Sequence, residues 1–183
     1  MRGVPVRTRA ALACAALALA VPAALPAADV RSKIFAAFEQ LHSYKLTVLG
    51  SVRSSGVWVA PDRYQMTTVF AGKPIRTIII GKEYWTLVEG KWKKSGTASN
   101  NLYVDIAGLI GVAKANPRTP LIPLPSETIG GKKLGVFGYD FADGTHERCD
   151  YDPKTYRVVR CKADQIVLLY SGFNDPSNVV PNP

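Results

Sequence analysis

The stretch RYQMTTVFAGKPIRTIIIGKEYWTLVEGKWKK, residues 63–94, decides the fold class. It consists of short runs rich in Val, Ile, Thr, Tyr, Phe and Trp, separated by Ala-Gly, Gly-Lys and Glu-Gly pairs that are typical of tight turns. Tyr64, Met66, Thr68 and Phe70 alternate with more polar residues and so share one face of a strand. The crossover helices that a parallel sheet requires are missing between these runs. The stretch therefore predicts an antiparallel meander.

The strand pattern continues on both sides of this stretch. Residues 44–53 alternate between apolar and polar, and a turn at Ser54-Ser55-Gly56 is expected to lead into a short strand at 57–59. Four further strands are predicted in the C-terminal half, at 134–142, 145–152, 156–163 and 166–171. A sheet of about ten short strands does not stay flat, so we expect strong curvature.

Two segments have the spacing of amphipathic helices. Asp29 can cap a helix that runs to about His42, with an apolar stripe formed by Val30, Ile34, Phe38 and Leu41. A second helix is predicted over 100–115, where Gly108 and Gly111 weaken the pattern. Residues 116–125 contain four prolines and predict an extended connection, and the tail over 172–183 is expected to be irregular.

The N-terminus has the composition of a secretory signal. Three arginines among the first nine residues precede an unbroken apolar stretch over 10–21, which is too short to span a bilayer. Small residues before the first acidic residue suit cleavage near Ala27 or Ala28. We therefore expect a cleaved signal peptide over 1–28 and a single domain over 29–183.

The expected mature chain is moderately basic. The expected signal peptide contains three arginines and no acidic residue, so its removal lowers the formal net charge from +9 to +6. Lys and Arg are scattered along the strands, a distribution that argues against a nucleic-acid partner. Such a surface suits transient contact with an anionic membrane or an envelope protein, or is a generic soluble surface. The expected location is the periplasm, with secretion as the alternative.

Cysteine spacing predicts one disulfide. Cys14 lies in the middle of the apolar stretch, whereas a lipoprotein cysteine belongs at its end, so Cys14 is expected to leave with the signal. Cys149 and Cys161 flank Asp152-Pro153-Lys154-Thr155, a type I turn sequence, and folding about this turn places them opposite each other. A redox-active pair is the competing interpretation, but Cys-x-x-Cys spacing is absent.

Several short motifs, in this order along the chain, resemble the LolA-like family of bacterial periplasmic lipoprotein carriers and lipid-binding lipoproteins. They are Gly56-x-Trp58-x-x-Pro61-Asp62-Arg63-Tyr64, Gly81-x-x-Tyr84-Trp85 followed by Trp92, Asp152-Pro153-Lys154-Thr155, and Tyr170-x-x-Phe173-Asn174-Asp175-Pro176. The resemblance implies a mainly β fold, a half-barrel of about ten antiparallel strands covered by two or three helices. It also implies an apolar cavity for acyl chains between sheet and helices.

The candidate cavity residues are large apolar side chains on neighbouring strands and on the second predicted helix. They are Trp58, Tyr64, Met66, Phe70, Ile78, Ile80, Trp85, Leu87, Ile106, Leu109 and Ile110. For each residue alone, an ordinary core position is the competing interpretation. Burial of apolar area would let such a cavity hold an acyl chain without charged contacts.

Catalytic and metal-binding patterns are weak. Glu39 and His42 are three residues apart on the first predicted helix, without a further ligand cluster. His146 and Glu147 are neighbours on a strand and so point to opposite faces. The remaining candidates are acidic residues expected to be solvated in or beside turns: Asp140, Asp143, Asp150 and Asp152. Phosphate-loop and nucleophile-elbow motifs are also missing from the sequence.

These patterns predict a monomeric, non-enzymatic protein without metal or cofactor. The expected function is a periplasmic carrier that binds lipid or an acylated lipoprotein in the apolar cavity. The alternative is an envelope interaction or stress-sensing module with a fully packed interior. The volume enclosed between sheet and helices distinguishes the two.

Overall fold

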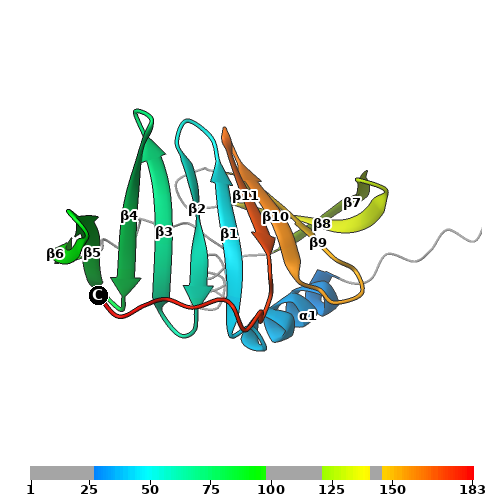
Figure 1. Cartoon of the computed structure of the whole chain (residues 1–183). Helices are drawn as coiled ribbons and strands as arrows, with labels where there is room; N and C mark the ends of the chain where they lie inside the picture. The colour runs from blue at the N-terminus through cyan, green and yellow to red at the C-terminus, as the bar shows by residue number, and fades with distance from the viewer. Residues whose placement is uncertain (1–26, 98–120, 141–145) are drawn as a thin grey trace, which may run out of the picture.

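A computed structural model of the protein describes residues 27–97, 121–140 and 146–183 (Figure 1). These residues form one helix, α1 (Ala27–Glu39), and eleven strands. The strands are β1 (Ser43–Leu49), β2 (Arg53–Val59), β3 (Arg63–Phe70), β4 (Lys73–Ile80), β5 (Glu83–Val88), β6 (Lys91–Thr97), β7 (Ile122–Ile129), β8 (Lys132–Asp140), β9 (His146–Tyr151), β10 (Val158–Ala163) and β11 (Ile166–Ser171).

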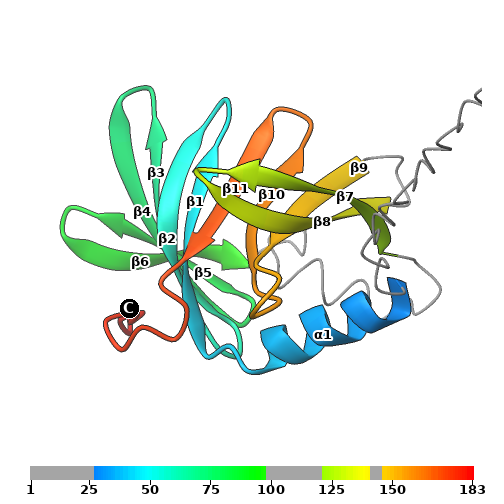
Figure 2. The ribbon, with the colours of Figure 1, turned by 90° about the vertical axis from the view of Figure 1, so that its right-hand side faces the viewer.

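All eleven strands belong to one antiparallel sheet of order β6-β5-β4-β3-β2-β1-β11-β10-β9-β8-β7. Two meanders meet in its middle, where β1 pairs with β11 and Leu46 lies opposite Tyr170. The sheet curves and stays open, with β6 and β7 as its edges, and β7–β10 bend toward the side that holds α1 (Figure 2). The predicted curved antiparallel sheet is confirmed, with one strand more than expected.

Gly56 lies within β2, and the predicted turn at residues 54–56 is wrong. The chain reverses instead at residues 50–52. Gly56 is paired with Met66 of β3. A Cβ atom at this glycine would lie 2.1 Å from the Gln65 carbonyl oxygen and 2.3 Å from Met66 Sδ. The glycine thus permits close packing between two central strands, a role that sequence alone does not distinguish from a turn.

β7 occupies part of the segment that was expected to be an unpaired connection. It pairs with β8 although it contains Pro123 and Pro125. An edge strand tolerates prolines because one row of its amide groups needs no partner strand. The pairing is also irregular between Leu124 and Glu127. The extended backbone was predicted correctly, and its place in the sheet was missed.

The described residues contain one helix, so the expectation of two or three helices is not confirmed. α1 ends at Glu39, three residues earlier than expected. The second predicted helix, over 100–115, lies outside the described residues. In the described part of the chain, no helix is both long enough and apolar enough to cross a membrane.

The core lies between α1 and the face of the sheet that is directed toward α1. This face is here called the helix-side face. Its side chains come from α1, from the central strands and from β8–β10. The buried members are Val30, Ile34, Leu41, Tyr44, Leu46, Trp58, Met66, Leu121, Phe137, Tyr139, Cys149, Tyr151, Val158, Cys161, Leu168 and Tyr170. The opposite face of the sheet is called the outer face.

The C-terminal tail crosses the ends of the central strands (Figure 1). Asn174 Oδ1 accepts a hydrogen bond from the His42 amide at 2.7 Å. Asn178 Nδ2 donates to Ser43 Oγ at 2.9 Å, and Arg63 Nη2 donates to the Val180 carbonyl at 3.0 Å. The tail is irregular, as predicted, but side chains fasten it to β1 and β3.

An ion-pair network on the outer face joins β7 to β9 and β10. Arg160 of β10 binds Asp150 of β9 through Nε at 2.5 Å and also pairs with Glu127 of β7. Arg148 binds the other oxygen of Glu127 at 2.5 Å. The Asp150 side chain is 1% exposed, so its predicted solvation is wrong. Burial raises the pKa of Asp150, and the Arg160 guanidinium opposes that rise.

Replacement of Arg160 tests the network. Arg160→Met leaves the Asp150 carboxylate buried without its cation, and we expect the free energy of unfolding to fall by about 2 kcal/mol. Arg148→Met is the matched control because the Arg148 side chain is 44% exposed, and it should cost less than about 1 kcal/mol. Urea unfolding measures both, and equal losses would contradict a special role for Arg160.

The raised pKa of Asp150 also predicts a pH dependence. The folded pKa lies above the ordinary value of 3.8, so the folded state keeps a proton that the unfolded chain has already lost. This contribution to stability is present at low pH and is lost as the pH rises through the folded pKa. As the pH rises through the folded pKa of Asp150, the free energy of unfolding should therefore decline more in the wild type than in Asp150→Asn. Parallel pH profiles would refute the assignment.

Candidate functional site

An aromatic cluster occupies the centre of the helix-side face. Trp58 of β2 stacks on Tyr44 of β1 at 4.8 Å between ring centroids, and on Phe38 of α1 at 5.8 Å. Tyr44 makes an edge contact with Tyr170 of β11 at 5.6 Å. Such pairs add specific geometry to the burial of large apolar area. The cluster therefore fixes α1 against the junction of the two meanders.

Three of the sequence-predicted cavity residues extend this cluster along the same face. Trp58 pairs with Tyr64 in the register of β2 and β3, and Met66 follows two residues after Tyr64. Directly paired residues and residues two apart share a face, so all three point toward the α1 side. Trp58 and Met66 are buried and Tyr64 is half-buried.

The other predicted cavity residues lie elsewhere. Phe70 shares the helix-side face but is 63% exposed at the tip of the β3–β4 hairpin. Ile79 pairs with Tyr64 on the helix-side face, so its neighbours Ile78 and Ile80 point to the outer face. Trp85 pairs with Ile78, and Leu87 follows two residues later, so both also point to the outer face. The outer-face residues are Ile78, Ile80, Trp85 and Leu87. The helical candidates Ile106, Leu109 and Ile110 lie outside the described residues.

Trp58 and Thr77 each place a buried polar atom on the helix-side face. Trp58 is 4% exposed and Thr77 is 3% exposed. Neither Trp58 Nε1 nor Thr77 Oγ1 has a hydrogen-bond partner in the described part of the chain. Because an indole N–H and a hydroxyl can both donate, these atoms could bind a carbonyl oxygen of a bound molecule.

A second group of aromatic residues covers the β8–β10 part of the face. Tyr151 lies 6.3 Å from Phe137 and stacks on Tyr156 at 5.8 Å. Lys33 of α1 lies over the Tyr156 ring at 5.1 Å. The Tyr151 ring rests on Gly135, where an added Cβ would come within 2.2 Å of it. Burial raises the pKa of the Tyr151 hydroxyl.

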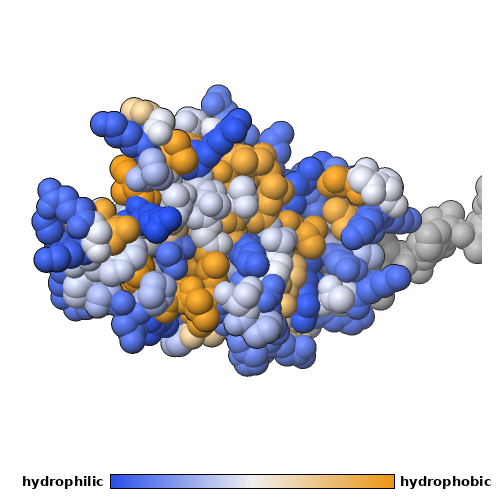
Figure 3. Space-filling view, viewed as in Figure 1, coloured by the Kyte–Doolittle hydropathy of each residue, from blue (hydrophilic) through white to orange (hydrophobic). Residues whose placement is uncertain are grey.

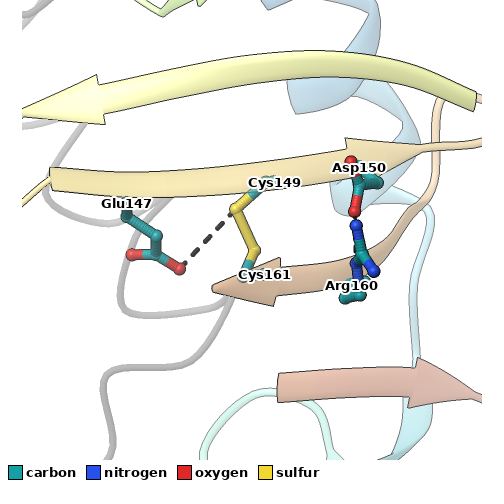
Figure 4. The surroundings of a disulfide bond; sticks show 5 residues. All are labelled: Glu147, Cys149, Asp150, Arg160 and Cys161. Carbon is teal, nitrogen blue, oxygen red and sulfur yellow. Dashed lines mark hydrogen bonds and ion pairs between the residues drawn. A yellow bond between two sulfur atoms is a disulfide. The ribbon is translucent and has the colours of Figure 1, made fainter. Parts of the chain in front are cut away.

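The predicted disulfide between Cys149 and Cys161 is confirmed (Figure 4). The two residues pair directly between β9 and β10, and both are fully buried on the helix-side face. Glu147 Oε1 lies 3.6 Å from Cys149 Sγ. These three residues are close enough to surround an ion, but sulfurs joined to each other offer no thiolate ligands. Asp150 and Arg160 occupy the other face of the same strands.

His146 and Glu147 point to opposite faces, as their adjacency predicts. Glu147 is 3% exposed, whereas the His146 ring is exposed and binds Asp140 Oδ1 at 2.7 Å. The hydrogen bond to Asp140 raises the pKa of His146. Glu39 and His42, the weak candidate pair for a metal, do not share a helix, because α1 ends at Glu39 and His42 lies beyond it.

One pocket formed by described side chains lies beneath α1. This small apolar pocket, of about 10 Å³, lies between α1, the β9–β10 turn and Phe173. A larger open groove, of about 400 Å³, lies on the outer face and is lined by residues that include Lys45, Thr47, Val57 and Gln65. The surface in Figure 3 mixes apolar patches with hydrophilic side chains.

Several residues of the helix-side face are not among the sequence-predicted site residues. Tyr44 shows the period-two pattern of its strand but was not assigned to the site. Tyr170 belongs to a continuous apolar run, Ile166 to Tyr170, which hides the alternation of faces. Phe137 and Tyr139 lie on β8 among glycines, and only the register with β9 reveals their face. Glu147 was set aside as a neighbour of His146.

Removal of the disulfide tests its structural role. The chain-entropy model gives a stabilisation of about 3 kcal/mol for a short loop such as this, which spans a sequence separation of 12. We expect the double variant Cys149→Ala, Cys161→Ala to lose about this much free energy of unfolding. Chemical denaturation of the wild type with and without reductant provides the control. An unchanged unfolding midpoint on reduction would argue against the role.

No family model and no curated protein sequence matches this chain. Several solved structures, however, superpose on this chain. The lipoprotein LppX of Mycobacterium tuberculosis superposes with a TM-score of 0.58 at 13% identity, covering 83% of this chain and 97% of LppX. LprF of Mycobacterium bovis gives a TM-score of 0.58 at 13% identity and covers 86% and 98%.

A conserved protein of Thermus thermophilus superposes with a TM-score of 0.52 at 10% identity, over 86% of this chain and 94% of the other. At such low identities the likeness concerns the fold. Nearly the full length of each solved chain is matched, so the likeness covers a whole domain. The chain therefore shares the fold of LppX and LprF.

Proposed function

We propose that the protein binds the acyl chains of a lipid or an acylated lipoprotein on its helix-side face. The observation that carries this proposal is the extent of that apolar face. Its buried residues run from Ile79 on β4, through the aromatic cluster around Trp58, to Phe137 on β8. An acyl chain gains about 0.8 kcal/mol for each CH₂ group that leaves water. A face of this kind suits apolar cargo.

The buried polar atoms support a cargo with a carbonyl group close to its acyl chains. Trp58 Nε1 and Thr77 Oγ1 both lie on this face and have no hydrogen-bond partner among the described residues. A buried donor without a partner costs about 1–3 kcal/mol. An ester or amide oxygen of a bound lipid would remove that cost and set the position of the head group.

Fold and sequence together support an envelope location. LppX is a lipoprotein, and this chain shares its fold. Its N-terminal sequence is that of a signal peptide over 1–28, and a buried disulfide suits an oxidising compartment. We therefore place the domain over 29–183 in the periplasm, with secretion as the alternative.

The proposed mechanism is passive and uses no catalytic group. Cargo would move from this protein to a membrane or to an acceptor protein according to their relative affinities for the acyl chains. Each 1.4 kcal/mol of difference in binding free energy corresponds to an about tenfold difference in affinity between the acceptor and this protein. The protein itself would act as a monomeric carrier.

One observation favours a second function, an envelope interaction module with a packed interior. The pocket beneath α1 holds only about 10 Å³, less than one acyl chain requires, so cargo would have to bind beside α1 or displace it. In a packed module the aromatic cluster would only stabilise the fold, and a protein partner would bind the outer surface.

Paired tryptophan variants separate the two functions. Trp58 lies on the helix-side face and Trp85 on the outer face, and both indole nitrogens are buried without a partner among the described residues. We expect Trp58→Phe to weaken binding of a fluorescent acyl amide about tenfold, through the lost hydrogen bond and contact area. Trp85→Phe is the matched control and should bind like the wild type.

Fluorescence titration of delipidated protein measures these affinities, and thermal unfolding verifies that both variants fold. Equal affinities in the two variants would indicate that the cargo does not bind on the helix-side face. A wild-type protein that binds no acyl probe would leave the packed module as the better account.

A further inference from the structure

Two neighbouring hairpin tips at one end of the sheet expose large apolar side chains. The turns between β1 and β2 and between β3 and β4 point in the same direction (Figures 1 and 2). The exposed residues are Leu49 (38%), Val52 (38%), Val69 (46%), Phe70 (63%) and Ile75 (39%). An exposed phenylalanine with four aliphatic neighbours is unusual on a surface that serves only for solubility.

The strand register holds the two tips side by side. Arg53 at the start of β2 lies opposite Val69 near the end of β3. One pair further along, the hydroxyls of Ser54 and Thr68 are 2.8 Å apart. The two tips therefore form one surface, here called the hairpin rim and defined as residues 49–53 and 69–76.

The hairpin rim is basic as well as apolar. Arg53, Lys73 and Arg76 are exposed, and residues 49–53 and 69–76 include no acidic residue. Basic side chains beside exposed apolar ones match a membrane surface, where anionic head groups lie above the acyl boundary.

The apolar residues surround the tips instead of covering one face. Leu49 pairs with Val167 and belongs to the outer face, as does Val69. Phe70 and Ile75 belong to the helix-side face by the same alternation. A protein partner that docks on one face would leave the other exposed. A bilayer interface accepts a tip from all sides, so the arrangement favours a membrane over a protein partner.

We infer that the hairpin rim docks reversibly on an anionic membrane surface. Phe70 and its aliphatic neighbours enter the interfacial layer, and Arg53, Lys73 and Arg76 contact lipid phosphates. This places the strand ends at the membrane and leaves the rest of the sheet in water. The inference goes beyond cargo binding and does not depend on it.

Vesicle co-sedimentation tests the inference. The probes are vesicles of phosphatidylcholine alone and of phosphatidylcholine mixed with phosphatidylglycerol. We expect the wild type to bind the mixed vesicles at least tenfold more tightly than the neutral ones. Phe70→Ser should reduce binding to mixed vesicles about tenfold, and Lys73→Gln about fivefold.

Matched controls use residues away from the hairpin rim. Val179→Ser changes a side chain in the C-terminal tail that is 67% exposed, and Lys154→Gln changes an exposed lysine in the β9–β10 turn. Both should bind like the wild type. Thermal unfolding should be unchanged in all four variants. Acyl-probe affinity in solution should be unchanged in Lys73→Gln, Val179→Ser and Lys154→Gln, because none of these three side chains belongs to the helix-side cluster.

The inference is overturned if the wild type binds neither vesicle, if it binds both equally, or if the rim variants behave like their controls. The vesicle assay and the acyl-probe titration test the two proposals independently. Loss of vesicle binding with intact probe binding rejects the docking rim only, and loss of probe binding with intact docking rejects the carrier only.

Discussion

The pairing of β1 with β11 is the contact on which the rest of the structure depends. It joins two meanders that would otherwise be separate sheets, and it sets Leu46 against Tyr170. Tyr44 can then contact both Trp58 and Tyr170, which gives α1 a continuous aromatic surface to cover. Asn174 and Asn178 reinforce the junction through hydrogen bonds to the chain at His42 and Ser43. A β contact between segments so far apart in the sequence carries a loop-closure cost in entropy.

Local features of the sequence predicted the fold class and the disulfide well. The alternating runs and their turns are short-range signals, and a proline turn between Cys149 and Cys161 fixes which residues face each other. Where a local signal was ambiguous, the prediction was wrong. Gly56 suits a turn as well as a close strand contact, and Pro123 and Pro125 are compatible with an edge strand as well as with a loop.

The candidate site was predictable only in part, because faces depend on register. The run Ile78 to Ile80 is apolar throughout, so its sequence does not indicate which residues share a face. The strand register places Ile79 on the helix-side face and the other two isoleucines on the outer face. Asp150 looked like a turn residue, and only its pairing with Arg160 across the β9–β10 hairpin explains why a carboxylate is buried there. Tyr170 joins the site through the β1–β11 pairing, which sequence spacing does not encode.

The central claim is that the helix-side face holds acyl chains. Native mass spectrometry of the protein purified from its own host, followed by lipid extraction, tests this claim most directly. We predict a mass in excess of the polypeptide that disappears on delipidation and yields acylated molecules in about one-to-one ratio. A polypeptide that carries no extra mass, and an extract without acyl chains, would contradict the claim.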